Sequence, residues 1–366
     1  MKPSPVLALA CAAAVGATGS TAWASAHHGR PARQPAIACS GDPSVAHRLD
    51  LTVDGVRTFG FYAVPAGKAR GLVVFDHGYG HTAYSWVQHV EQVAKRDHVI
   101  AVAMDYHSQH DSPPAKPGSL PSSRGWRVGE GADDSIAAAK VFDTRCVPHG
   151  TNTIYGVSMG GNTSGLVVAA NPKRADGSPL FDYWFAIEPA ADVTETWAEA
   201  SAVAQSGNTF GKQAAADIEE EMGGTPMDAS AAYQSHSVVA RIADIASAGI
   251  KGVAVVQGVD DGLVPYNQSR ELVAELRAAQ IPTDDVTAGT RGNGEAGTTA
   301  SSYAIGSTGQ ESPFAGHGSE VSNTQVVIET GFALLDNLYL HQQGPACRDS
   351  VRDGDTSAWM IGPAAC

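Results

Sequence analysis

Hydrophobic positions along the chain fall into short continuous runs, separated by segments that are apolar on one helical face. Continuous runs rich in Val, Ile, Leu and Phe are typical of strands buried on both faces of a parallel sheet. Such runs predict strands at 71–76, 98–104, 154–157, 181–187 and 250–256. Segments with helical periodicity predict helices at 86–96, 129–143, 162–168, 266–280 and 326–340. The alternation predicts an α/β fold, with a mostly parallel sheet and helices on both faces.

Three further segments have a different pattern. Residues 47–53 alternate between polar and apolar, turn at Asp54-Gly55 and resume over 56–64, which predicts two antiparallel edge strands. Residues 193–235 are rich in Ala and Glu and exceed the length that a crossover requires, so we interpret them as a helical cap over the carboxyl ends of the strands. Residues 288–318 are dominated by Gly, Thr and Ser, which predicts a long loop.

Length and composition favour one large domain. The chain has 366 residues, 43% of them hydrophobic, and we assign residues 47–341 to this domain, with a lead at 27–46 and a tail at 342–366. Residues 1–26 contain no acid, have Lys2 near the start and an apolar core, and end near Ala24, which predicts a secretory signal peptide. No later run approaches the ~20 apolar residues of a membrane span, so we expect a secreted protein without a stable membrane anchor.

The charge balance argues against one class of partner. The formal net charge is −14, and removal of a leader that carries Lys2 as its one charged side chain would change it to −15. Such an acidic surface repels phosphate backbones, so nucleic acid is not an expected partner.

Four cysteines remain after the expected leader, an even number for an oxidising compartment, and none shows C-x-x-C spacing. They predict two disulfides and no cysteine metal site. Of three possible connectivities we favour Cys347 with Cys366, which would staple the tail, and Cys39 with Cys146, which would tie down the N-terminal lead.

The expected strand at 154–157 ends in Gly156-Val157-Ser158-Met159-Gly160 and passes into the helical run at 162–168. A serine hydroxyl becomes a useful nucleophile when a sharp turn lifts it clear of its neighbours beside a base, and glycines allow such a turn. The turn would also aim the Met159 N–H, at the start of a helix, toward a developing oxyanion. Ser158 is therefore the candidate nucleophile.

A base and an orienting acid are expected farther along the chain. Asp261 follows a buried strand, where backbone N–H groups can hold a carboxylate ionised; the competing candidates are Asp260 and Glu188. His317 is the candidate base because glycines on both sides let its imidazole approach the serine, and because it follows the acid and precedes the last helix.

The order Ser158, Asp261, His317 resembles that of α/β-hydrolases, and the resemblance covers about residues 47–341. The segment 258–277 resembles dienelactone-hydrolase-like and prolyl-oligopeptidase-like catalytic domains. Gly78-Tyr79, the Ser158 motif and a disulfide at the C-terminus are similar to bacterial cutinases and polyester hydrolases, although the expected cap has no cutinase counterpart. By this resemblance, Tyr79 and Met159 would supply the oxyanion-hole N–H groups.

These patterns imply a secreted serine carboxylic-ester hydrolase that works through an acyl-enzyme and needs no cofactor or metal. Its partner would be a small-molecule or polymeric ester, and we expect a monomer. A polyester hydrolase, a short-peptide hydrolase, an acyltransferase and a non-catalytic binding protein on the same scaffold remain alternatives.

We expect Trp184 in the core, and leave open whether other tryptophans line a pocket or pack in the core: Trp86, Trp126 and Trp197.

Overall fold

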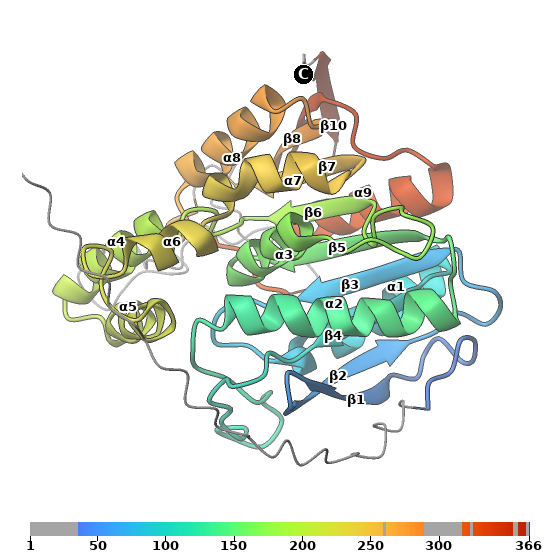
Figure 1. The fold of residues 1–366 in the computed structure, drawn as a ribbon, viewed down its shortest axis with the longest axis horizontal. Coiled ribbons are helices and arrows are strands. Elements are labelled where there is room, and N and C mark those ends of the chain that lie inside the picture. The colour runs from blue at the N-terminus through green and yellow to red at the C-terminus, as the bar shows by residue number, and fades with distance from the viewer. Residues whose placement is uncertain (1–35, 259–260, 289–316, 323–324, 354–357, 364–365) are drawn as a thin grey trace, which may run out of the picture. The chain divides into compact units, whose positions relative to one another are not determined.

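The computed structural model describes residues 36–258, 261–288, 317–322, 325–353, 358–363 and 366. Within them, strands form one mixed sheet in the order β1-β2-β4-β3-β5-β6-β7-β8-β9-β10 (Figure 1). The expected signal peptide at 1–26 and the alternative acid Asp260 lie outside the described residues, as does most of the loop predicted at 288–318.

The strands run parallel from β4 through β9, and β1, β2 and β10 are antiparallel to their neighbours. The α/β fold with a mostly parallel sheet is thus confirmed. One detail of the prediction is wrong: β2 pairs with both β1 and β4, so of these two strands β1 alone lies at an edge of the sheet. The strand bounds are β1 His47–Val53, β2 Val56–Ala63, β3 Gly71–Asp76, β4 Ile100–Met104, β5 Thr151–Val157, β6 Tyr183–Ile187, β7 Gly252–Gln257, β8 Thr283–Ala288, β9 Arg348–Arg352 and β10 Trp359–Pro363.

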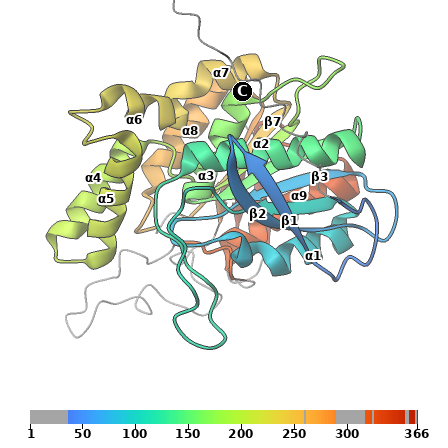
Figure 2. The same ribbon diagram turned by 60° about the horizontal axis from the view of Figure 1, so that its bottom comes forward.

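Helices cover both faces of the sheet, as expected. The apolar side chains of α1 and α9 bury one face, while α2, α3, α7 and α8 cover the other (Figures 1 and 2). Trp184 is fully buried among them, as predicted, and Trp86 is buried against Phe75 on the opposite face. The bounds are α1 Val87–Asp97, α2 Val128–Arg145, α3 Met159–Ala170, α7 Ile242–Ala248, α8 Tyr266–Ala278 and α9 Val326–His341.

The C-terminal part of the sheet was not predicted. β8 has the sequence Thr-Asp-Asp-Val-Thr-Ala, and its acids hid the strand from a search for apolar runs. Both acids are nevertheless buried, because Arg348 pairs with Asp284 at 2.6 Å and Arg270 pairs with Asp285. Charges can lie in a buried strand when each one finds a partner. The segment interpreted as a simple tail adds β9 and β10 to this edge.

The segment 193–235 forms helices, as predicted for the cap: α4 Val193–Gln205, α5 Thr209–Met222 and α6 Ser230–His236. Side chains cap two of them, since Asp192 accepts the N–H groups that open α4 and Asn208 those that open α5. The three helices stand beyond the carboxyl ends of the parallel strands, at the left of Figure 1, and Figure 2 shows the same relation. They cover the end of the sheet where sites of α/β proteins form.

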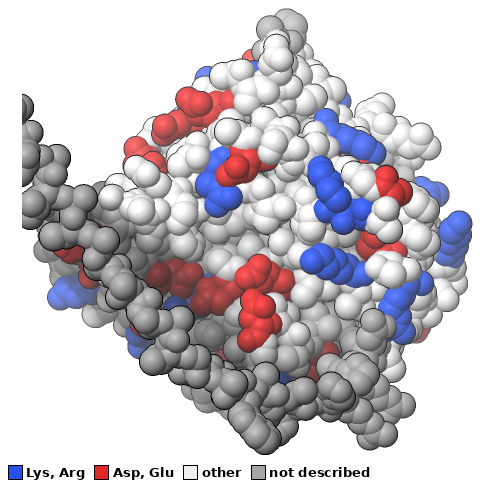
Figure 3. Space-filling model, in the orientation of Figure 1, with Lys and Arg blue, Asp and Glu red and all other residues white. Residues whose placement is uncertain are grey.

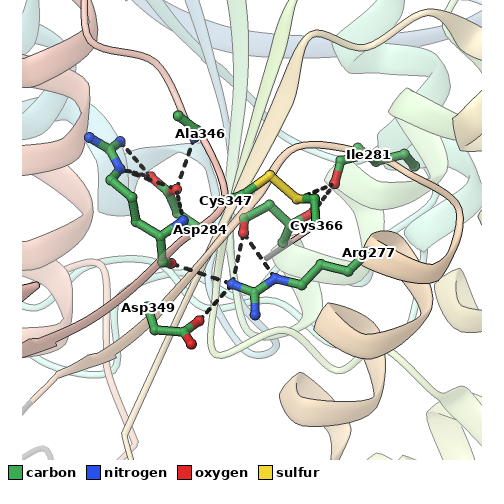
Figure 4. Close-up of a disulfide and its surroundings, with 9 residues drawn as sticks. Arg277, Ile281, Asp284, Ala346, Cys347, Asp349 and Cys366 are labelled. Atoms are coloured by element: carbon green, nitrogen blue, oxygen red, sulfur yellow. Dashed lines mark hydrogen bonds and ion pairs between the residues drawn. A yellow bond between two sulfur atoms is a disulfide. The ribbon is translucent and has the colours of Figure 1, made fainter. Parts of the chain in front are cut away.

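Two disulfides join Cys39 to Cys146 and Cys347 to Cys366, the pairing favoured by the sequence. The first attaches the N-terminal lead to the end of α2. The second closes a short C-terminal loop beside the β8–β9 edge, where Arg277 donates to the Asp349 carboxylate at 2.7 Å (Figure 4). The disulfides therefore attach the N-terminal lead to α2 and the last residue, Cys366, to the start of β9.

Basic side chains gather at the end of the sheet opposite the cap (Figure 3). There, two neighbouring hollows are lined by lysines and arginines, two of which, Arg174 and Lys251, pair with aspartates: Lys68, Arg70, Lys140, Lys173, Arg174 and Lys251. The cap end contributes several acids instead. Among the described residues, no helix is both long and apolar enough to cross a membrane.

Candidate active site

Ser158 occupies the turn between β5 and α3, with φ 59° and ψ −121°. This backbone conformation is strained for a residue with a side chain, so the surroundings must hold it. A Cβ added to Gly156 would lie 1.9 Å from the Gly160 carbonyl oxygen, and one added to Gly160 would lie 2.2 Å from that of Asp76. The Gly-x-Ser-x-Gly pattern is therefore a steric requirement of the turn.

Backbone hydrogen bonds fix the same turn. The Ser158 N–H donates to the Ile187 carbonyl at 2.9 Å, and its carbonyl accepts from Gly161 at 2.8 Å and Ala190 at 3.2 Å. Met159 is the first residue of α3, so its N–H lies at the positive end of the helix dipole. The turn thus holds the Ser158 side chain at the mouth of two cavities, both of which it lines.

The loop after β3, residues 77–81, lines one of these cavities together with Ser158. Tyr79 lies in this loop, and its hydroxyl donates to Asp217 of α5 at 2.5 Å. Burial, together with this carboxylate, raises the pKa of the Tyr79 phenol far above its ordinary value. His77 is buried, contacts the Gly78 carbonyl at 3.0 Å and stacks on Tyr106, so it supports the loop from beneath.

Asp261 and His317 lie side by side, with 2.7 Å between Asp261 Oδ2 and His317 Nδ1. The other carboxylate oxygen of Asp261 accepts the N–H groups of Leu263 at 2.8 Å and Val264 at 2.9 Å. These donors fix the carboxylate in the turn after β7. His317 lines the same cavity as Ser158, so the structure brings all three residues to one place.

Glu188, the alternative acid, follows β6 and has φ 46°. Its carboxylate is 1% exposed, lies 3.5 Å from His317 Nδ1 and accepts the Gly318 N–H. Burial and then the charge of Asp261 raise the pKa of Glu188 well above its usual value. The imidazole therefore meets two carboxyl groups, of which Asp261 is the nearer.

The charge of His317 reflects a balance of burial and neighbours. Burial disfavours the imidazolium, but Asp261, followed by Glu188 and Glu320, outweighs burial and raises the pKa of His317 to about 9. An imidazolium that forms beside Ser158 is thus strongly stabilised, as a base that accepts a proton requires.

Glu320 joins the loop that carries His317 to the loop that carries Tyr79. Its carboxylate accepts the Gly78 N–H at 2.9 Å, lies 2.7 Å from His81 Nδ1 and accepts from the Ser85 hydroxyl at 3.3 Å. Burial alone would raise the pKa of Glu320, but His81 and the Gly78 N–H lower it to about 2. Glu320 is therefore a buried anion with three polar partners on its Oε1 oxygen.

The two cavities beside Ser158 differ in size and lining. A chamber of about 260 Å³ extends beneath α4 and α5, and Trp126 lies in its wall. A more polar cavity of about 390 Å³ lies on the side of His317 and Glu320. Ser158, Tyr79, Phe210 and Leu263 line both, so the nucleophile lies where the cavities meet.

Sequence reasoning missed Glu320 and Glu199, a carboxyl group in the chamber wall. Glu320 lies only three residues after His317, and an acid so near the base could have drawn attention. Nothing in the local sequence distinguishes Glu199 from the other acids of the cap, because its place in the chamber depends on how α4 packs. The environment of Trp197 also depends on tertiary packing. This side chain is half-buried, and its indole N–H donates to the Glu219 carboxylate at 2.8 Å.

In the described part of the chain, the one cluster with the geometry for a metal ion is Glu188, Asp261 and His317. Hydrogen bonds already account for this cluster, because two backbone N–H groups and the imidazole hold Asp261, and Gly318 donates to Glu188. A histidine beside a carboxylate is also the pair that acts with the nucleophilic serine in a catalytic triad.

Comparison with known proteins shows the fold. Neither protein-family models nor curated protein sequences give a match. A structure described as one of two fungal esterases from Rhizomucor miehei matches with a TM-score of 0.54 and 15% identity, over 82% of this chain and 85% of that one. An esterase of Pyrobaculum calidifontis matches with a TM-score of 0.49 and 18% identity, over 66% and 75%. The likeness to the fungal esterase, together with the strand order, shows the α/β-hydrolase fold and no more than the fold at 15% identity.

Proposed function

We propose that the protein is a secreted serine carboxylic-ester hydrolase that acts through an acyl-enzyme. One observation carries the proposal: Ser158, on a strained turn, opens into the same cavity as His317, whose imidazole lies 2.7 Å from Asp261. The α/β-hydrolase fold supplies the scaffold. The leader-like sequence at 1–26 and the two disulfides support export.

In the proposed first half-reaction, His317 removes the Ser158 proton as the oxygen attacks the ester carbonyl. The N–H groups of Tyr79 and Met159 hold the oxyanion of the tetrahedral intermediate. Asp261 orients the imidazole and stabilises its positive charge. When the intermediate collapses, the carbon–oxygen bond to the alcohol breaks and His317 gives the alcohol its proton, which leaves an acyl-Ser158 ester.

In the second half-reaction, water enters the position of the alcohol. His317 removes a proton from the water as its oxygen attacks the acyl-enzyme, and the same N–H groups hold the second oxyanion. The Ser158 oxygen then leaves and recovers its proton from His317, releasing the carboxylic acid. Each proton that His317 accepts is returned, so the reaction consumes only ester and water.

A fluorophosphonate probe tests the proposal, because it reacts only with an activated serine. We expect stoichiometric labelling on the peptide that contains Ser158, together with hydrolysis of p-nitrophenyl acetate. Ser158→Ala should neither label nor turn over, whereas Ser206→Ala, at an exposed serine after α4, should do both. A folded protein that does not label, or that labels at another serine, would refute the proposal.

A further inference from the structure

The geometry around Ser158 assigns the two cavities to the two halves of an ester, on the basis of the proposed function. The leaving alcohol takes its proton from His317, so the alcohol must lie in the cavity of about 390 Å³ that His317 lines. The acyl group remains on Ser158 and must occupy the other space. That space is the chamber of about 260 Å³ beneath α4 and α5.

The chamber is compact and mostly apolar. Aromatic rings of Tyr79, Trp126 and Phe210 form one side, with ring centroids 6.0 Å apart for Tyr79 and Trp126 and 5.4 Å apart for Tyr79 and Phe210. Aliphatic side chains, among them Val203 and Leu263, line the rest. An engineered apolar cavity of about 150 Å³ holds benzene, so this chamber has room for a short aliphatic chain or a single ring.

One carboxyl group interrupts this apolar lining. Glu199 on α4 lines the chamber and accepts from the Gln268 amide at 3.2 Å. Burial raises the pKa of Glu199 to about 8, and the charges of Glu195, Asp261 and Asp192 act in the same direction. No lysine, arginine or histidine is among the described residues that line the chamber.

We propose that the chamber binds a compact, uncharged acyl group and that Glu199 is a specificity residue that excludes anionic acyl groups. A carboxylate on the acyl chain would lose its water and find an acid in the wall with no cation nearby. That burial is costly for any unpaired charge. A methyl group loses nothing there, and the carboxyl of Glu199 can hydrogen-bond an uncharged polar group.

Two p-nitrophenyl esters of equal chain length test this proposal: the pentanoate and the monoester of pentanedioic acid, which ends in a carboxylate. At pH 7 we expect kcat/KM of the wild type to favour the pentanoate by about 100-fold or more, since an unpaired buried charge costs several kcal/mol. At pH 9, where Glu199 is ionised, Glu199→Gln should narrow this ratio by about tenfold. Glu220→Gln removes the same charge from an exposed position on α5 and should change the ratio by less than about twofold.

Wild-type enzyme supplies a second measurement that needs no variant. The ratio of kcat/KM for pentanoate to that for acetate should fall as pH rises past about 8, because ionised Glu199 disfavours an apolar chain. Ionisation of His317 changes kcat/KM for both esters by the same factor, so it cancels in this ratio. Equal rates for both five-carbon esters, an unchanged ratio in Glu199→Gln, or hydrolysis of acetate but not pentanoate would overturn the proposal. Failure of probe labelling would instead refute the proposed function.

A second inference rests on different residues. We infer that Glu320 is a positioning residue that sets the geometry of the oxyanion loop. It lies in the same loop as His317, is 1% exposed, and accepts the N–H of Gly78, the residue before Tyr79. His81, at the other end of that loop, is held by the same carboxylate at 2.7 Å. One anion therefore fixes both sides of Tyr79 and links them to the base.

Replacement of Glu320 should lower kcat more than it raises KM. We expect Glu320→Ala to lose about 10² in kcat, the lower bound for loss of an oxyanion-hole donor, with KM changed by less than about threefold. Glu320→Gln retains an oxygen that can accept the Gly78 N–H, so it should recover most of kcat. Ser85→Ala removes only the weakest contact, at 3.3 Å, and should have the smallest effect.

The pH profile separates positioning from a purely structural role. Asp261, Glu188 and Glu320 all raise the pKa of His317, and Asp261 and Glu188 remain in both variants. Loss of the Glu320 charge should therefore move the acid limb of kcat/KM to lower pH in Glu320→Gln and Glu320→Ala alike. An unchanged kcat in a folded Glu320→Ala, or an acid limb that stays in place in both variants, would overturn the inference.

Discussion

The nucleophile side of the site and the acid and base side are built in different ways. The turn that holds Ser158 depends on close backbone contacts, because Gly156 lies against the Gly160 carbonyl and Gly160 lies against the Asp76 carbonyl. The opposite side gathers Glu188, Asp261 and His317 from segments that follow different strands. Short-range sterics govern the first side, and hydrogen bonds and charges between distant segments govern the second.

This contrast teaches where substitutions should be tolerated. A turn that depends on van der Waals contact has little freedom, so a change there either removes the chemistry or disturbs the backbone. Electrostatic positioning depends on the sum of several partners, so single changes on the acid and base side should have graded effects.

Ser158→Ala should have the largest effect. Removal of a triad serine costs on the order of 10⁶ in kcat, because no other group can form the acyl-enzyme. The hydroxyl contributes little to packing at the mouth of the cavities, so the melting temperature should stay within about 3 °C of the wild type. Kinetics with p-nitrophenyl acetate, which should show no burst, measure the loss of kcat. Thermal melts measure the melting temperature. Residual turnover above a few per cent would remove Ser158 from the mechanism.

Asp261→Asn and Glu188→Gln compare the two carboxyl groups that face His317. Asp261→Asn should lower kcat by on the order of 10⁴, since the wrong imidazole tautomer results. Glu188 lies 3.5 Å from Nδ1, farther than Asp261 at 2.7 Å, so Glu188→Gln should cost less than about tenfold in kcat. A larger loss in Glu188→Gln would assign the orienting role to Glu188.

The pH dependence of kcat/KM should reveal the summed charge around His317. The reaction needs the neutral imidazole, and neighbouring carboxylates raise its pKa to about 9. Activity should therefore rise with pH, by about tenfold per unit, and level off above about pH 9. Initial rates with p-nitrophenyl acetate from pH 6 to 10 provide the measurement, corrected for spontaneous hydrolysis. An acid limb centred near 6.5 would show that these charges are screened.

The disulfides should matter for stability and not for chemistry. Replacement of both Cys39 and Cys146 by Ala should lower the free energy of unfolding by about 2–4 kcal/mol, and kcat should be unchanged. The sequence separation is 107 for this pair and 19 for Cys347 and Cys366, so the chain-entropy argument predicts the smaller loss for the second pair. Denaturant melts of the two double variants test the order. A loss of kcat in either would connect that disulfide to the site.

Much of the fold could be predicted from the pattern of the chain. Strands β3 to β7 are buried on both faces, and continuous apolar runs report that environment directly. The same rule failed for β8, where Asp284 and Asp285 are neutralised by arginines far away in the sequence. It also failed for β9 and β10, which are short strands; β10 lies at the edge of the sheet. A pattern search cannot detect burial that depends on a distant partner.

The sequence by itself predicted the turn around Ser158, and the contact that excludes a side chain at Gly156 lies within five residues, at the Gly160 carbonyl. It also named Asp261 and His317 as candidates through their places after strands and before the last helix. Only the tertiary structure decided which acid lies nearest His317 Nδ1, at 2.7 Å for Asp261 against 3.5 Å for Glu188. It alone placed Glu320 against Gly78 and Glu199 in the chamber wall. Neighbouring residues are enough to predict a turn that is constrained by local steric contacts. The distance between two charges is fixed only when the whole sheet and its cap have packed.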